Sequence, residues 1–302
     1  IDLLGVIDGE FFVGAVTAGF GFLNESDARE QNDYILAVAD EYPAVIPFVN
    51  INLSWSNWFD EAKRLLQYGA RGFGELRPGG QGWDPLDSEA KRLYELADDS
   101  DVPLLWHTSE PFGHTYPGKT GGITPYSLLM CATEFPKVTM IGAHLGGGVP
   151  FFLQMPEIRR ATPNLLFDTA AGPLLYGKRC VSRLVDLVGA DRVLFASDFP
   201  LRNPLNDLKL AFDGLSEEDA YAIGVFNGRA KSPRLCFGTS RETGNCIPNL
   251  GVLNYKLNIS KNKKKRFNEI INDNLIDSSL NSYLDENDKR KLKSIKQVPK
   301  HK

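Results

Sequence analysis

Three polar residues stand directly after short apolar runs, where a buried strand would end. His107 follows Val-Pro-Leu-Leu-Trp, His144 follows Val-Thr-Met-Ile-Gly-Ala, and Asp198 follows Arg-Val-Leu-Phe-Ala-Ser. Two imidazoles and a carboxylate are ligand types that Zn²⁺, Mn²⁺ and Fe²⁺ accept, and a site short of protein ligands keeps a position for water. A metal would lower the pKa of that water toward about 7, and an unligated His or Asp nearby would move protons. Each residue alone is more often structural, but the three together favour a metal site.

Further residues of the same kind accompany them. Glu75 and Arg77 come at the end of another apolar run. The Arg77 guanidinium would bind a substrate carboxylate through two hydrogen bonds, with a structural ion pair as the alternative. His114 lies in the long loop after His107, where it would reach over the site or remain a surface residue. Gly146-Gly147-Gly148 would let backbone approach a ligand closely. Neither a G-x-S-x-G motif nor a recognisable Cys/His spacing supports covalent nucleophilic catalysis.

The elements that must position these residues recur along the chain. Seven apolar runs without polar alternation suit parallel strands that are buried on both faces. Their starts are 29, 26, 31, 36, 27 and 28 residues apart, the length of one strand plus one returning helix. The runs are Val16–Phe22, Val45–Ile51, Arg71–Leu76, Val102–Trp106, Val138–Ala143, Leu165–Phe167 and Val193–Ala196. The spacing predicts an α/β fold, a (β/α)₈ TIM barrel whose first strand is missing, with a doubly wound open sheet as the rival.

Helices are expected between these runs. One is predicted over Asp27–Tyr42 with Ser26 as its N-cap, and another over Asp87–Asp98. Barrel chemistry sits at the C-terminal ends of the strands, where the polar residues above occur.

Charge divides the 302 residues into two parts. Residues 1–230 carry 18 basic and 31 acidic side chains, whereas residues 231–302 carry 16 basic and 7 acidic side chains. The net charge of the whole chain is −4. We predict a barrel over 1–230 and a mobile, basic, low-complexity tail over 231–302. The tail lacks interleaved aromatic residues, so nucleic acid is not a favoured partner.

Composition also limits the compartment. The longest apolar stretch is too short and too rich in glycine to span a bilayer, and the first residues do not form a signal peptide. No two of the four cysteines form a C-x-x-C motif, and we expect all four to be reduced. Cys131 and Cys180 are expected to be thiols buried in the core. These features predict a cytoplasmic protein without a membrane partner.

The segments at the strand ends resemble the amidohydrolase-related, metal-dependent TIM-barrel hydrolases, a group that includes aminocarboxymuconate-semialdehyde and resorcylate decarboxylases. The resemblance covers about residues 10–230 and rests on Gly72-Phe-Gly-Glu-Leu-Arg-Pro, Leu105-Trp-His-Thr-Ser-Glu-Pro, Ile141-Gly-Ala-His-Leu-Gly-Gly-Gly, Leu166-Phe-Asp-Thr-Ala-Ala, Leu194-Phe-Ala-Ser-Asp-Phe-Pro and Asn227-Gly-Arg-Ala. It implies that His107 is a metal ligand and that His144 binds metal or activates its water. It further implies that Asp198 is a ligand and proton shuttle, and that Glu75 bridges metal or acts as acid or base.

The family's first strand ends in His-x-His, and this sequence contains no such pair. We therefore expect that a segment of about 30 residues or more, one strand–helix unit, has been lost from the N-terminus.

These observations support three hypotheses. The first is a metal-dependent hydrolase that acts on a small organic substrate, with Zn²⁺ as the first choice of metal and Mn²⁺ as the second, and with Arg77 and His114 binding substrate. The second is a non-oxidative decarboxylase at the same site. The third is an inactive fragment that lacks the His-x-His ligands, or a binding module that uses its basic tail. Homo-oligomerisation stays open.

Overall fold

Seven short strands alternate with helices in the order that the sequence predicts. The computed structural model describes residues 14–108, 110–116 and 118–226, together with three short strands between residues 237 and 252. The seven strands are β1 (Ala15–Ala18), β2 (Val45–Val49), β3 (Gly72–Leu76), β4 (Leu104–Trp106), β5 (Met140–Gly142), β6 (Leu165–Asp168) and β7 (Val193–Leu194). Each strand overlaps one of the predicted apolar runs, so these predictions are confirmed.

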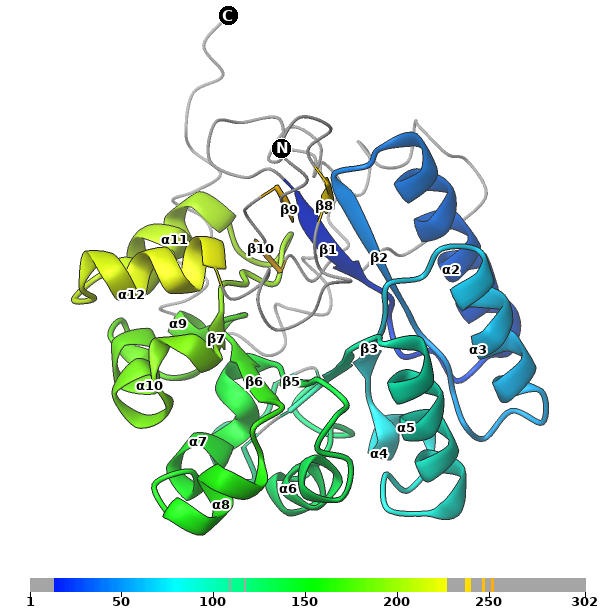
Figure 1. The fold of residues 1–302 in the computed structure, drawn as a ribbon, viewed down its shortest axis with the longest axis horizontal. Helices are drawn as coiled ribbons and strands as arrows, with labels where there is room; N and C mark the ends of the chain where they lie inside the picture. The colour runs from blue at the N-terminus through cyan, green and yellow to red at the C-terminus, as the bar shows by residue number, and fades with distance from the viewer. Residues whose placement is uncertain are drawn as a thin grey trace, which may run out of the picture. The chain divides into compact units, whose positions relative to one another are not determined.

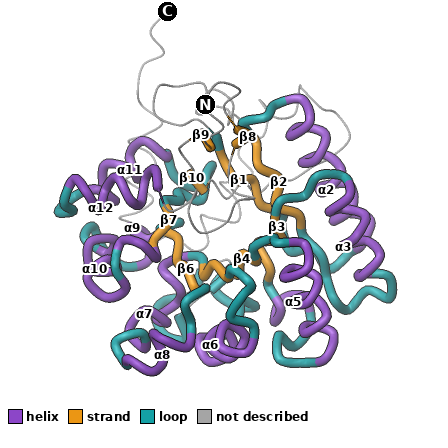
Figure 2. Tube along the Cα trace, viewed as in Figure 1, coloured by secondary structure: helices purple, strands orange, loops and turns teal. Residues whose placement is uncertain are grey.

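Helices connect the strands and lie outside them (Figures 1 and 2). The α-helices are α2 (Glu25–Glu41), α3 (Trp58–Gln67), α4 (Pro78–Gln81), α5 (Ser88–Ser100), α6 (Pro125–Glu134), α7 (Val149–Phe152), α8 (Pro156–Ala161), α9 (Gly172–Leu175), α10 (Cys180–Val188), α11 (Pro204–Phe212) and α12 (Glu217–Tyr221). The described residues also form helical turns of other types, η1 (His144–Gly148), η2 (Ala190–Arg192) and η3 (Ala222–Phe226).

The order of the strands in the sheet decides between the two predicted folds. Neighbours follow chain order from β1 to β7, and every pair is parallel. A doubly wound sheet would reverse direction part of the way along, whereas a TIM barrel adds strands in sequence. The sheet also curls, with the helices on its outer face (Figure 1). The TIM-barrel prediction is therefore confirmed, and the doubly wound alternative is wrong.

One further strand lies beside β1. The short β10 (Gly251–Val252) pairs with β1 in parallel, on the edge opposite β2, where a strand preceding β1 would pair. The other two late strands, β8 (Phe237–Thr239) and β9 (Cys246–Ile247), form a separate antiparallel pair. Among the described strands no pairing joins β7 to β10, so their hydrogen-bonded ladder is not a complete ring.

The core lies inside the curl of the sheet. Alternate residues of successive strands form one buried cluster, which includes Val16, Ile46, Leu105, Ile141, Leu166 and Leu194. The residues between them, such as Thr17, Leu104 and Met140, are also buried. Strands buried on both faces explain why the predicted runs lack polar alternation. The packing of this apolar cluster therefore holds the C-terminal ends of the strands in place.

The start of α2 differs from the prediction. Asn24, not Ser26, is the N-cap, because the Asn24 side-chain oxygen accepts a hydrogen bond from the Ser26 backbone N–H at 2.8 Å. Ser26 therefore lies in the first helical turn. Asp87 caps α5 by accepting from the Ala90 N–H.

The chain forms two compact units. The first comprises Ile1–Pro111 and Thr120–Leu257, and the second comprises Phe112–Lys119 and Asn258–Lys302. Apart from β8, β9 and β10, the predicted mobile tail over 231–302 lies outside the described residues.

Cys131 and Cys180 are buried free thiols, as expected. Within the described residues no helix is long and apolar enough to cross a membrane.

Candidate metal centre

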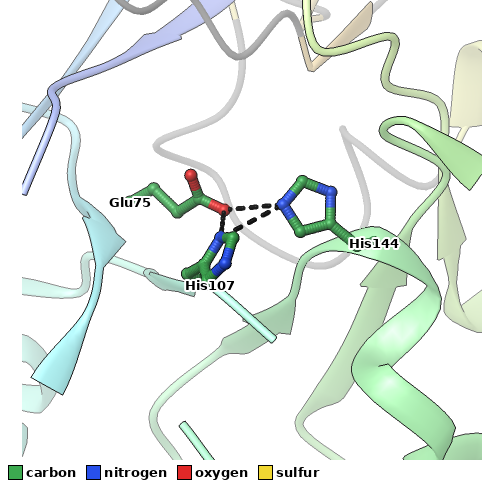
Figure 3. A group of neighbouring side chains, drawn as sticks. All are labelled: Glu75, His107 and His144. Atoms are coloured by element: carbon green, nitrogen blue, oxygen red, sulfur yellow. Dashed lines mark hydrogen bonds and ion pairs between the residues drawn. The ribbon is translucent and has the colours of Figure 1, made fainter. Parts of the chain in front are cut away.

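Three side chains from neighbouring strands meet at the C-terminal end of the sheet (Figure 3). Glu75 lies near the end of β3, and His107 is the first residue after β4. His144 is the second residue after β5 and the first residue of η1. Strand β4 pairs with β3 on one side and with β5 on the other, so three successive strand ends present these side chains together. Their convergence follows from the parallel order of the strands.

The potential ligand atoms are close and buried. Glu75 Oε1 lies 2.8 Å from His107 Nδ1 and 3.1 Å from His144 Nε2, and the two ring nitrogens are 3.2 Å apart. Neighbouring ligands of an ion at about 2.1 Å are themselves roughly 3.0–3.4 Å apart, so the triangle matches the spacing that a divalent cation requires. All three side chains are 2–6% exposed. The set of two imidazoles and a carboxylate therefore fits a transition-metal ion.

Neighbouring groups fix the orientation of His144. Its Nδ1 lies 3.1 Å from the Ala170 carbonyl oxygen, which can only accept a hydrogen bond, so Nδ1 carries the proton. The neutral ring then has its lone pair on Nε2, which faces Glu75 and His107 (Figure 3). This tautomer is the one that a metal ligand needs.

Asp168, the last residue of β6, holds the backbone of His144. Asp168 Oδ1 accepts hydrogen bonds from the backbone N–H groups of His144 and Ala170, both at 3.0 Å. His144 has a φ of +56°, in the left-handed region that residues other than glycine seldom adopt. Such conformations persist where the surroundings hold them, and they cluster at functional sites.

The charges around the triad favour a cation. Burial opposes the charged form of Glu75, but the charge and hydrogen bond of His107, with His144, hold the pKa of Glu75 well below its usual range. Burial would lower the pKa of His144, but the hydrogen bond and charge of Glu75, with the charges of Asp198 and Asp168, raise it to about 9. Burial raises the pKa of Asp168 to about 6. An excess of carboxylates around two imidazoles attracts positive charge.

The structure groups the predicted site residues differently from the sequence. His107 and His144 lie together, but Glu75 completes their group, within 4.8 Å, in place of Asp198. Asp198 is buried, has a left-handed φ of +61°, and raises the pKa of His144 through its charge. It follows β7, which is two strands away from β5 in the sheet. Its role as a ligand or proton shuttle stays a prediction.

Two predicted substrate residues lie in different surroundings. Arg77 is half-buried after β3 and donates from Nη2 to the Thr120 carbonyl oxygen at 2.7 Å. No ion pair links Arg77 to an acidic residue of the described chain, so the structural alternative is not supported. His114 is exposed in the loop Phe112–Lys119, and its ring lies 5.6 Å from that of Tyr116. Its role over the site stays a prediction.

Some supporting residues were not predicted. Asp168 follows the run Leu165–Phe167, so the rule that identified His107 would also have selected it. Asn50 Nδ2 donates to the Glu75 carbonyl oxygen at 2.6 Å, and Gln81 Nε2 donates to Asn50 Oδ1 at 2.8 Å. Both amides are buried, and no sequence motif marks them.

Comparison with known proteins places this arrangement in context. Residues 13–230 match the family described as amidohydrolase. No curated protein sequence matches the chain.

Solved structures share the fold at low sequence identity. A 2,6-dihydroxybenzoate decarboxylase from Rhizobium is 18% identical, with 75% of this chain and 85% of that chain covered and a TM-score of 0.57. A dihydroxybenzoic acid decarboxylase from Polaromonas, solved with bound manganese and 2-nitroresorcinol, is 16% identical, with 70% and 76% covered and a TM-score of 0.52. A 4-oxalomesaconate hydratase from Rhodopseudomonas palustris is 19% identical, with 72% and 75% covered and a TM-score of 0.51.

Proposed function

Since this chain belongs to the amidohydrolase family, we propose that it is a metal-dependent enzyme that hydrolyses a small organic substrate. The observation that carries the proposal is the buried triangle of Glu75, His107 and His144, whose ligand atoms lie 2.8–3.2 Å apart. A divalent cation bound there would balance the charge of the buried carboxylate and accept the lone pairs of the two imidazoles.

Each residue of the triangle has a defined part. His107 Nδ1, His144 Nε2 and Glu75 Oε1 would hold a divalent ion. When bound, the ion supplies Lewis acidity and lowers the pKa of water to about 7. The Ala170 carbonyl holds the His144 ring in the ligating tautomer, and Asp168 holds its backbone. Asp198, buried and close enough to affect His144, is the proposed proton shuttle.

The metal follows from the ligand types. Two nitrogens and one oxygen suit both Zn²⁺ and Mn²⁺. Zn²⁺ is our first choice because it is common in hydrolytic sites with imidazole ligands. Manganese bound in one of the structurally similar decarboxylases supports the alternative.

Non-oxidative decarboxylation is the second candidate. It is favoured by the decarboxylases among the structures with the same fold. In that reaction the bond between the substrate and its carboxylate carbon breaks, carbon dioxide leaves, and a proton takes its place. Asp198 would deliver that proton, because both ring nitrogens of His144 are already engaged, by the metal and by the Ala170 carbonyl.

Metal analysis of the purified full chain tests the first step. We expect near-stoichiometric Zn²⁺ or Mn²⁺ after loading and dialysis, measured by plasma mass spectrometry. Glu75→Gln, His107→Ala and His144→Ala should each reduce the metal content about tenfold or more, because each removes a ligand. His114→Ala, which changes a histidine outside the triangle, should retain it. A chain that holds no metal, or ligand variants that hold as much as the unaltered chain, would refute the proposed centre.

Product analysis tests the reaction. The metal-loaded chain would be assayed for hydrolysis of lactones, esters and amides of small organic acids, and separately for carbon dioxide release from hydroxybenzoates. We expect hydrolysis that is lost on treatment with a chelator. Carbon dioxide release without hydrolysis would replace the first candidate with the second.

A further inference from the structure

Glu75 lies in an irregular part of β3. On the β4 side, Phe73 pairs with Leu104. The next pair joins Leu76 to Trp106, so β3 advances by three residues where β4 advances by two. Such a bulge changes the direction in which side chains point, and bulges are frequent beside functional sites. On the other side, the pairing of β3 with β2 ends at Phe73. Regular strand pairing therefore does not hold the backbone that carries Glu75.

The side chain of Asn50 holds this backbone instead. Asn50 is the first residue after β2 and is fully buried. Its Nδ2 donates to the Glu75 carbonyl oxygen at 2.6 Å, while the Glu75 N–H donates to the Gly19 carbonyl oxygen at 3.1 Å. Both backbone groups of Glu75 thus have hydrogen-bond partners outside β4. With its backbone held in this way, Glu75 directs its carboxylate toward His107 and His144 (Figure 3).

Two further amide side chains hold Asn50. Asn32 of α2 binds both backbone groups of Asn50: its Oδ1 accepts from the N–H at 2.9 Å, and its Nδ2 donates to the carbonyl oxygen at 2.7 Å. Gln81 Nε2 donates to Asn50 Oδ1 at 2.8 Å and to the Ile51 carbonyl oxygen at 3.0 Å. Gln81 Oε1 accepts from the Arg77 N–H at 3.1 Å. We call Asn32, Asn50 and Gln81 the amide cluster.

The amide cluster lies in the interior of the protein. Its three side chains belong to residues that are at most 1% exposed. Burying an amide costs free energy unless its hydrogen bonds are made, and here each side chain both donates and accepts. Buried networks of this kind are rigid and specify one arrangement of the groups that they join. Apolar side chains would fill the same space, but they could not hold a backbone carbonyl where strand pairing is interrupted.

We propose that Asn50 is the positioning residue for Glu75. Asn32 and Gln81 contribute by holding Asn50. Asn50 acts through the backbone carbonyl of Glu75 and so sets the place of its carboxylate, whose Oε1 lies within 3.1 Å of both imidazoles of the metal centre. The expected effect on metal binding rests on the proposed function, whereas the effect on the carboxylate in the metal-free chain does not.

Zn²⁺ affinity, compared with stability, tests the proposal in the full chain. Asn50→Ala should weaken Zn²⁺ binding about 10–100-fold, and Gln81→Ala should weaken it less, because Gln81 acts through Asn50. Asn164→Ala is the matched control, since Asn164 Nδ2 donates to the carbonyl oxygens of Phe135 and Val138 before the strands begin. Like Asn50→Ala, it should unfold at a lower urea concentration, but it should bind Zn²⁺ within about twofold of the unaltered chain.

A second measurement needs no metal. The ionised Glu75 carboxylate can only accept a hydrogen bond, so His107 Nδ1 carries the proton in the metal-free chain. In a chain labelled with ¹⁵N-histidine, this buried N–H should exchange slowly with water and give an NMR signal that Glu75→Ala removes. We expect the signal to be lost in Asn50→Ala and kept in Asn164→Ala. If Asn50→Ala does not fold, Gln81→Ala takes its place, with faster exchange as the expected result.

The outcomes separate this proposal from the proposed function. Variants of Asn50 and Gln81 that lose stability but keep the imidazole signal and full Zn²⁺ affinity would overturn the positioning role and leave the metal centre standing. Absence of the signal from the unaltered chain would also overturn it. An unaltered chain that retains no metal would refute the metal-dependent reaction. The imidazole signal then decides alone: its loss in Asn50→Ala supports the positioning role, and its persistence there overturns it.

Discussion

Replacing Asp168 tests how the fold holds a proposed metal ligand in a strained conformation. Asp168 Oδ1 accepts the backbone N–H groups of His144 and Ala170, and the His144 backbone is left-handed with a φ of +56°. Asp168→Ala removes the one oxygen that accepts both hydrogen bonds and leaves two buried donors without partners. Asp168→Asn keeps a carbonyl oxygen of the same shape as an acceptor and removes the charge. The two variants therefore separate the hydrogen bonds from the charge.

The size of the effect follows from these contacts. A hydrogen bond to a charged group contributes about 1.5–3 kcal/mol, so losing two should lower the free energy of unfolding by about 3–6 kcal/mol. Burial raises the pKa of Asp168 to about 6, so its buried charge costs free energy at neutral pH. Both substitutions remove that cost, but only Asp168→Asn keeps an acceptor, so its loss should be smaller, about 1–2 kcal/mol.

Metal affinity should fall in the same order. Loss of a group that orients a ligand typically weakens metal binding about 10–100-fold, which is the range expected for Asp168→Ala. Urea unfolding of the metal-free chain gives the change in stability, and competition with a fluorescent chelator gives the affinity. The reasoning would be refuted if Asp168→Ala unfolded within about 1 kcal/mol of the unaltered chain and bound metal equally tightly.

Two further predictions concern stability. Glu61, with a side chain only 2% exposed, pairs with Arg29 at 2.6 Å and Arg64 at 2.7 Å, and although burial opposes its charged form these arginines lower its pKa. Its contribution to the free energy of unfolding is therefore present above the unfolded pKa of about 4.3 and is lost as pH falls through the lower folded pKa. In urea unfolding, Glu61→Gln should lower the free energy of unfolding by about 2 kcal/mol at pH 7 and by little at acid pH. An equal decrease at both pH values would contradict this. Gly146→Ala should lower the unfolding temperature more than Gly148→Ala. Both glycines have positive φ, but of the two added Cβ atoms only the one at Gly146 would overlap with Phe167 Cδ1. Equal shifts of the two unfolding temperatures in calorimetry would show that the overlap is relieved.

Much of the fold could be predicted from local pattern. Parallel strands buried on both faces have continuous apolar runs, and the length of a returning helix sets their spacing, so seven strands were located within a few residues. The start of α2 was misplaced because Asn24 and Ser26 are both good caps, and only the backbone geometry selects between them. The sequence did not indicate that β10 would pair with β1, since two residues carry no periodic signal.

The chemistry at the strand ends was visible in the same pattern. His107, His144 and Asp198 each follow an apolar run, and the rule that strand ends hold the active site of a barrel is enough to select them. Their identity as candidates depends only on residue type and position along the chain.

Which of these residues meet was decided by the tertiary structure. The adjacency of β3, β4 and β5 places Glu75 beside the two histidines, whereas Asp198, two strands further along from His144, influences the group through its charge. The left-handed backbone of His144 is held by Asp168, from the next strand, which accepts a hydrogen bond from the His144 N–H group. Local sequence sets which side chains reach the end of the sheet, but the distances between them depend on strand neighbours and backbone turns that form only when residues far apart in the chain pack together.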